Sequence, residues 1–219
     1  MRHYLGRFVG FVFGVLLSLG AGATVITEAN NTASFTLSKD VGGGLVLIAN
    51  GTLSISGFGT SALTVHIDLS NLTTLNGIPL TPAANARLTG FGFGIDPTAT
   101  GVLFSDAVDG GVVDASLAPV DGLAAIQICA WGGNSCSGTQ NGGILVGGLD
   151  SFNLILQGNW GRQVTVDPLG VIFQTIEGRF AFDCTGNCAS VPEPQSLALV
   201  ALGLLAAGAI GRRKVAISR

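Results

Sequence analysis

Apolar and polar residues alternate at every second position through much of the middle of this chain. In residues 63–69, LTVHIDL, the odd-numbered side chains are apolar and the even-numbered side chains are polar. Successive side chains of a β-strand point to opposite faces of a sheet, so this period indicates half-buried strands. No window of the middle region shows the spacing of an amphipathic helix. The pattern therefore predicts an all-β domain over residues 24–183.

Further short apolar runs, such as FGFGI, SFNLILQ, QVTVD and GRFAFDC, are bounded by Gly, Asn, Asp or Pro. Asn or Asp before Gly suits the positive φ angles of tight hairpins. Many short strands with such turns are typical of an antiparallel β-sandwich or jelly roll. A parallel β-solenoid is the alternative that the 34 glycines suggest, but no fixed repeat period supports it. The expected turns are Asn50-Gly51, Asn76-Gly77, Asp109-Gly110, Asp121-Gly122 and Asn141-Gly142.

The charge of the middle region differs from that of the whole chain. The chain has a net charge of −3. Residues 24–190 hold four Lys or Arg and twelve Asp or Glu, and four minus twelve gives −8. A domain this acidic offers no basic face to nucleic acid, so nucleic acid is excluded as a partner.

The N-terminal end has the features of a secretory signal peptide over residues 1–23. Arg2 and Arg7 form a basic start, residues 8–19 are apolar, and Ala21-Gly22-Ala23 provides small residues for cleavage. We expect export by the Sec machinery and cleavage by signal peptidase after Ala23. An uncleaved anchor helix is the alternative.

The C-terminal end carries an apolar run, residues 196–211, followed by a basic tail over residues 212–219. A helix of this run would be about 24 Å long at ~1.5 Å per residue, which is short against a hydrocarbon core of ~30 Å. Arg212, Arg213 and Lys214 would stay in the cytoplasm, so the preceding domain would lie outside the inner membrane. We therefore predict a short transmembrane helix. A buried core helix is the alternative.

Pro192, Glu193 and Pro194 stand just before this apolar run. Pro-Glu-Pro, a short Gly/Ala/Leu-rich helix and a closing basic cluster resemble the PEP-CTERM sorting signal, here over residues 192–219. The resemblance implies that an exosortase, an integral-membrane enzyme, recognises the signal and removes the tail. It also implies a Gram-negative bacterium that makes extracellular polysaccharide, and export to the cell surface or biofilm matrix. Residues 184–191 would be a linker between the domain and this signal.

The four cysteines form two local pairs in the sequence. Export places them in an oxidising compartment, where disulfides are expected. The local pairing Cys129–Cys136 with Cys184–Cys188 is favoured over the two other pairings. A four-cysteine zinc site is the alternative, but the spacings of six and three residues between ligands suit it poorly.

Motifs that would indicate catalysis are missing from the exported region. Its one histidine, His66, is expected at the solvated face of a strand, and no G-x-S-x-G, G-x-G-x-x-G or phosphate-loop motif occurs. The twelve acids leave a two-carboxylate glycosidase site open. We expect a protein that is not an enzyme and has no resident cofactor.

Two groups of residues could bind a ligand. Asp106, Asp109 and Asp114 surround two glycines and could hold calcium, although turn formation explains them too. Trp131 and Trp160 stand beside glycines and could stack on sugars, or could instead close the ends of the sandwich.

Three functions follow from these features. The first is a non-catalytic surface or biofilm-matrix protein that an exosortase processes and that associates with extracellular polysaccharide. The second is a glycan- or calcium-binding adhesive module with the same destination, and the third is a secreted polysaccharide-modifying enzyme.

Overall fold

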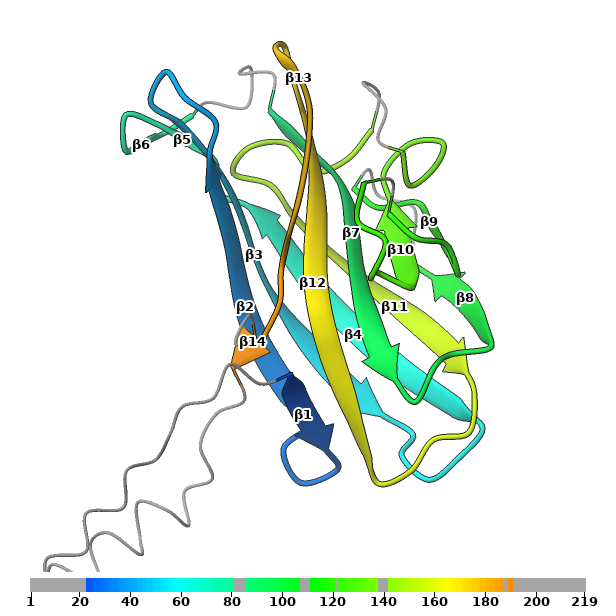
Figure 1. Cartoon of the computed structure of the whole chain (residues 1–219). Helices are drawn as coiled ribbons and strands as arrows, with labels where there is room; N and C mark the ends of the chain where they lie inside the picture. Colours follow the sequence, from blue (N-terminus) through cyan, green and yellow to red (C-terminus); the bar gives the residue numbers. More distant parts are fainter. Residues whose placement is uncertain are drawn as a thin grey trace, which may run out of the picture.

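The structure is a computed structural model that describes residues 23–80, 86–106, 111–120, 122–137, 142–186 and 189–190. Every regular element in these ranges is a β-strand, and all strand pairs are antiparallel. The strands form two sheets that lie one in front of the other (Figure 1). The predicted all-β antiparallel architecture is confirmed. The pairings do not establish a jelly-roll order.

The larger sheet has eight strands in the described part of the chain, and its main path has the order β14-β2-β3-β4-β11-β8. A two-strand extension, β5 and β6, pairs with β3. The bounds are β2 (Thr32–Asp40), β3 (Leu45–Ser56), β4 (Ala62–Asn71), β5 (Thr74–Leu75), β6 (Ile78–Pro79), β8 (Gly101–Ser105), β11 (Leu149–Gln157) and β14 (Ala189–Ser190).

The smaller sheet has six strands in the same ranges, with the order β1-β12-β7-β10-β9 and β13 also paired with β12. The bounds are β1 (Thr24–Thr27), β7 (Arg87–Asp96), β9 (Asp114–Ser116), β10 (Ile128–Trp131), β12 (Gln163–Thr175) and β13 (Gly178–Cys184).

The apolar faces of the two sheets meet in one core. Leu63, Val65 and Ile67 of β4 are fully buried, as the alternation predicts. Phe35 of the eight-stranded sheet stacks on Phe91 of the six-stranded sheet, with ring centroids 5.1 Å apart. An aromatic pair of this kind adds about 0.5–1.5 kcal/mol beyond its burial. The core therefore joins the two sheets into a sandwich.

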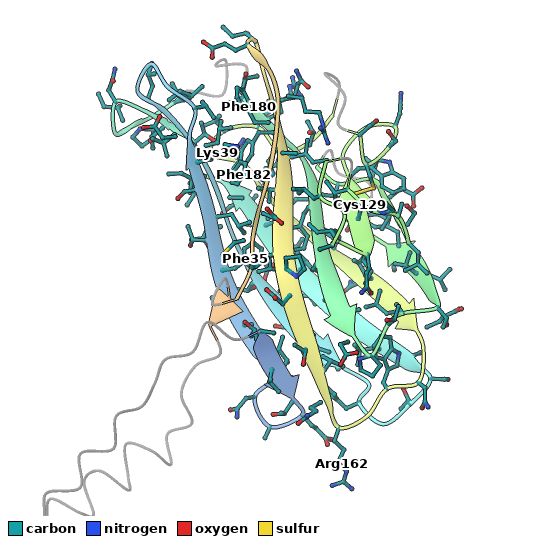
Figure 2. The ribbon with its side chains drawn as sticks, viewed as in Figure 1. Phe35, Lys39, Cys129, Arg162, Phe180 and Phe182 are labelled. Atoms are coloured by element: carbon teal, nitrogen blue, oxygen red, sulfur yellow. A yellow bond between two sulfur atoms is a disulfide. The ribbon has the colours of Figure 1, made fainter. Side chains whose placement is uncertain are left out.

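A contact near one edge also joins the sheets. The ammonium of Lys39, on β2, lies 5.6 Å from the ring centroid of Phe182, on β13 (Figure 2). Phe182 in turn stacks on Phe173 of β12, with centroids 5.9 Å apart. The cation–π contact contributes about 0.5–1 kcal/mol where it is exposed, so β13 helps to close this edge.

Part of the outer face of the six-stranded sheet is covered by the segment between β9 and β10 together with the disulfide loop. A second apolar cluster forms there, and it contains Val120, Leu123, Ile126, Cys129, Cys136 and Ile172. Gly92 of β7 lies directly beneath this segment, because a Cβ at this position would be only 2.6 Å from Ile126 Cγ2. Gly92 therefore allows a third layer to pack closely on the sheet.

Two sequence expectations are corrected. Asn50-Gly51 is not a turn but lies inside β3, which is one continuous strand. Gly51 is required there because a Cβ would be 2.6 Å from the ring of Phe35. Likewise, QVTVD is not a separate short strand but the start of the longer strand β12, which continues to Thr175. By contrast, Asn76-Gly77 is a turn as expected, with φ of 52° and 76°.

Both ends of the described domain lie at the same side of the sandwich (Figure 1). β1 is the terminal strand of the smaller sheet, where Thr24 lies opposite Val166. β14 is the terminal strand of the larger sheet, where Ser190 lies opposite Ser34. The end of the expected linker, residues 184–191, is thus part of the sheet rather than free chain.

Candidate functional site

The outer face of the eight-stranded sheet is the exposed sheet face of the described domain. Polar side chains cross it in three rows, perpendicular to the strands, because the register places them opposite one another. We call these sets the polar rows. The first contains Thr32, Ser54, His66, Asn153 and Ser105, the second contains Ser34, Thr52, Asp68 and Ser151, and the third contains Thr36, Asn50 and Ser70.

Side-chain hydrogen bonds join two pairs of neighbours in the first polar row. The hydroxyls of Thr32 and Ser54 are 3.1 Å apart, and Thr32 also donates to Asn31 Oδ1 at 3.3 Å. On the next two strands, His66 Nδ1 lies 2.9 Å from Asn153 Oδ1. Hydroxyl, amide and imidazole groups thus place hydrogen-bond donors and acceptors across the sheet.

The second polar row is centred on the carboxylate of Asp68. Ser151 donates a hydrogen bond to Oδ1, and Thr52 donates to Oδ2 at 3.1 Å. His66 Nε2 lies 3.4 Å from Oδ1. The Ser151 hydroxyl, and to a smaller extent Thr52 and His66, hold the pKa of Asp68 below its ordinary value of 3.8, against the opposing effect of partial burial. This carboxylate is therefore ionised at neutral pH.

The arrangement of Ser151, Asp68 and His66 differs from that of a nucleophilic triad. In such a triad the imidazole accepts the hydroxyl proton and the carboxylate orients the imidazole. Here Ser151 donates to the carboxylate, while the imidazole contacts Asn153 and Asp68. The serine hydroxyl is therefore hydrogen-bonded to the carboxylate and not to the imidazole.

A shallow polar depression lies at one end of the first row. It has a volume of about 230 Å³ and lies between the β1–β2 turn and the end of β3. Its lining residues are Glu28, Asn31, Ile55, Ser56, Gly57 and Phe58. Asn31 belongs both to this depression and to the hydrogen bonds of the first row, so the two features are continuous.

The two tryptophans lie in different environments. Trp160 is 3% exposed, and its indole Nε1 donates to the carbonyl of Leu156 at 3.0 Å. A buried indole presents no ring face to a sugar, so the structure does not support a glycan contact at Trp160. Trp131 is partly exposed and packs beside the second apolar cluster, and a sugar contact there stays a prediction.

The residues expected to bind calcium are only partly described. Asp114 is exposed and its Oδ1 accepts from the amide of Ala115 at 2.8 Å, whereas Oδ2 of Asp106 is buried without a hydrogen-bond partner in the described structure. Asp109 lies outside the described residues. Within the described ranges, no three His, Cys, Asp or Glu residues are grouped to hold a metal. Calcium binding stays a prediction.

Sequence reasoning missed the buried carboxylate of Asp150. This residue is 4% exposed, and it accepts hydrogen bonds from the backbone amides of Val112 and Ser151. A Cβ on Gly111 would collide with this carboxylate. The sequence does contain a signal: Asp150 is a polar residue at an inward position of the alternating strand LDSFNLIL.

The Cys129–Cys136 disulfide is present, and its Cα atoms are 6.1 Å apart. Both cysteines belong to the second apolar cluster, so the bond fastens the covering layer onto the six-stranded sheet (Figure 2). Cys184 is also disulfide-bonded. Cys188 lies outside the described residues, and its pairing with Cys184 stays a prediction.

Most of the sorting residues also lie outside the described ranges. These are Ala21 of the cleavage site, the motif Pro192, Glu193 and Pro194, and the basic cluster Arg212, Arg213 and Lys214. Ala23 is described and lies directly before β1. No helix that could span a membrane occurs in the part of the chain that the structure describes.

Comparison with known proteins gives a match at the C-terminal end of the chain. No curated protein and no solved structure matches it. A family model does match, over residues 190–214, and it begins at the last residue of β14. The expected resemblance is confirmed: the C-terminus of this chain carries the PEP-CTERM protein-sorting motif.

Proposed function

We propose that this chain is a non-catalytic surface or biofilm-matrix protein of a Gram-negative bacterium, exported by the Sec machinery and processed by an exosortase. The observation that carries the proposal is the sorting motif at residues 190–214, placed directly after a β-sandwich. Such a motif supports a transient membrane anchor and an exosortase as the processing partner. Signal peptidase would cleave after Ala23, which leaves β1 intact from Thr24.

The distance between the domain and the membrane follows from the length of chain between them. Only residues 191–195 separate Ser190 of β14 from the expected span at residues 196–211. A chain extends at most about 3.3–3.6 Å per residue, so this connection covers roughly 20 Å. The sandwich would therefore stay close to the outer surface of the inner membrane until the exosortase releases it.

The absence of catalysis is part of the proposal. Ser151, Asp68 and His66 are close together, but the hydroxyl donates to the carboxylate rather than to the imidazole. This geometry supports a stable polar surface more than an activated nucleophile. After processing, we propose that the released domain associates with extracellular polysaccharide.

Replacement of the motif tests the sorting step. Pro192→Ala, Glu193→Ala and Pro194→Ala, combined in one chain, should leave the protein in the membrane fraction at its unprocessed mass. Glu177→Ala, which also removes one carboxylate, should be processed like the native chain. Release of the triple variant into the surface or medium fraction, in amounts equal to native protein, would refute processing at this motif.

A further inference from the structure

The two outer faces of the sandwich differ in what covers them. The six-stranded sheet carries the covering layer, and Gly92 of that sheet contacts it. Among the described residues, none forms such a layer over the polar rows of the eight-stranded sheet: His66 and Asp68 keep 43% and 44% of their side chains exposed. The first polar row, which spans five strands, is thus accessible to a ligand.

The charge of this surface is unlike that of the rest of the domain. Residues 24–190 contain twelve acids, of which the polar rows contain Asp68 alone, and the rows contain no Lys or Arg. A polyanion would find no cationic partner there. The single carboxylate is already bonded to Thr52, Ser151 and His66, so it offers little to a polycation.

The side chains of the rows also argue against a protein partner. Protein interfaces are enriched in aromatic residues, Met and Arg at their centre. The polar rows contain only Ser, Thr, Asn, His and Asp, and the exposed Leu103 and Leu149 lie outside them, on β8 and β11 of the same face. Hydroxyl and amide groups at closely spaced positions are instead complementary to the hydroxyl groups of an uncharged sugar chain, because each can both donate and accept hydrogen bonds.

The depression at the end of the first row adds a phenyl ring, which the polar rows themselves lack. The partly buried Phe58 contributes this aromatic ring, while Glu28, Asn31 and Ser56 contribute polar groups. Shallow sites that combine a ring with a few polar groups can fix the orientation of one unit of a ligand. From Asn31 the hydrogen bonds continue through Thr32 to Ser54.

The geometry points to a binding site for a neutral polysaccharide, with one sugar unit in the Phe58 depression and the chain continuing over the first polar row to Asn153. This inference rests on the proposed association with polysaccharide and places it on one surface. Trp131, on the opposite side of the sandwich, is not part of the site.

Affinity electrophoresis of the processed protein tests the site, with hydroxyethylcellulose and dextran as neutral probes and alginate as an anionic probe. We expect at least one neutral probe to retard the native protein, and alginate to have no effect. The combined variant Thr32→Ala, Ser54→Ala and Asn153→Ala should lose at least tenfold in affinity. Thr165→Ala, on the outer side of β12, is the matched control and should bind like the native protein.

Separate observations distinguish a loss of binding from a loss of folding and from a loss of sorting. All three positions of the variant point outward from the sheet, so its melting temperature should stay close to the native value. Ser54→Tyr, which blocks the first row without removing its neighbours, should also abolish retardation. Native migration of both variants, or no retardation of the native protein by either neutral probe, would overturn the site. Processing of the native protein by the exosortase would still stand in that case, so the two proposals fail independently.

Discussion

Ser190 pairs with Ser34 at the edge of the larger sheet, and the sorting motif begins at the same Ser190. The folded domain and the sorting signal therefore meet without an intervening free linker. β14 pairs with β2, which lies near the start of the domain. The last strand of the domain is therefore held in place by residues from near its beginning. The last described strand and the match to the sorting motif thus share one residue, Ser190.

Gly92→Ala should destabilise the domain by about 1–3 kcal/mol, the usual cost of overpacking. A Cβ at this position would lie 2.6 Å from both Ile126 Cγ2 and the carbonyl oxygen of Ile128, and the backbone cannot easily move away. Chemical denaturation measures the effect. Gly161→Ala is the control, because its nearest neighbour would be 3.9 Å away, and it should change stability by less than ~0.5 kcal/mol. Equal stability of the two variants would contradict the close packing of the covering layer.

Removal of the Cys129–Cys136 disulfide, by alanine at both positions, should cost about 2 kcal/mol. The cross-link closes a loop with a sequence separation of 7, and loop-closure entropy gives a value of this size. The loss should be measurable as a lower midpoint of denaturation. Ser137→Ala, an exposed change within the same region, should leave the midpoint unchanged. A double variant as stable as the native protein would show that the bond does not fasten the covering layer.

Trp160→Ala should destabilise the domain by about 3–5 kcal/mol, because the buried indole fills space and bonds to Leu156. Trp131→Ala should cost clearly less, since Trp131 is partly exposed. Both values come from denaturation followed by circular dichroism. Acrylamide should quench the fluorescence of the Trp131→Ala variant less than that of the Trp160→Ala variant. The reverse order in either measurement would contradict the assigned environments.

Ser151→Ala should weaken the domain at neutral pH but not at strongly acidic pH. The pKa of Asp68 is lowered in the folded state mainly by the Ser151 hydroxyl, so this bond stabilises the fold above the unfolded pKa of about 4. That contribution is lost as the pH falls through the lower folded pKa. The loss at pH 7 should stay below about 1 kcal/mol, because Asp68 is 44% exposed and solvent screens it.

Denaturation of the Ser151→Ala variant at pH 7 and pH 2 measures this difference, and Ser38→Ala on β2 serves as the exposed control. Nuclear magnetic resonance titration of the Asp68 carboxyl should give a midpoint below 3.8 in the native protein, and a higher midpoint in the variant. A midpoint unaffected by Ser151→Ala would show that the hydroxyl is not the main cause.

The strands of the core were predictable from local patterns. The alternation of β4 places Leu63, Val65 and Ile67 inside and leaves His66 and Asp68 outside, as the structure shows. The polar rows were harder to predict, because they depend on register. Nothing local places Asn153 beside His66, which is 87 residues away.

The roles of the glycines also depended on distant contacts. Asn50-Gly51 has the sequence of a hairpin turn, but Gly51 makes room for the ring of Phe35 within a continuous strand. Gly92 similarly makes room for Ile126, which comes from a covering layer that strand periodicity does not reveal. The sequence shows where each glycine stands, but it does not show which distant residue occupies the space that a side chain would need.

The intact mass of the mature protein, isolated from a strain that contains its exosortase, tests the central claim most directly. The account predicts a chain that begins at Thr24 and ends near Pro192–Pro194, without the apolar run and the basic tail. The same strain without the exosortase should give a chain that still ends at Arg219. A mature protein that keeps Arg212, Arg213 and Lys214 in the presence of the exosortase would contradict the account.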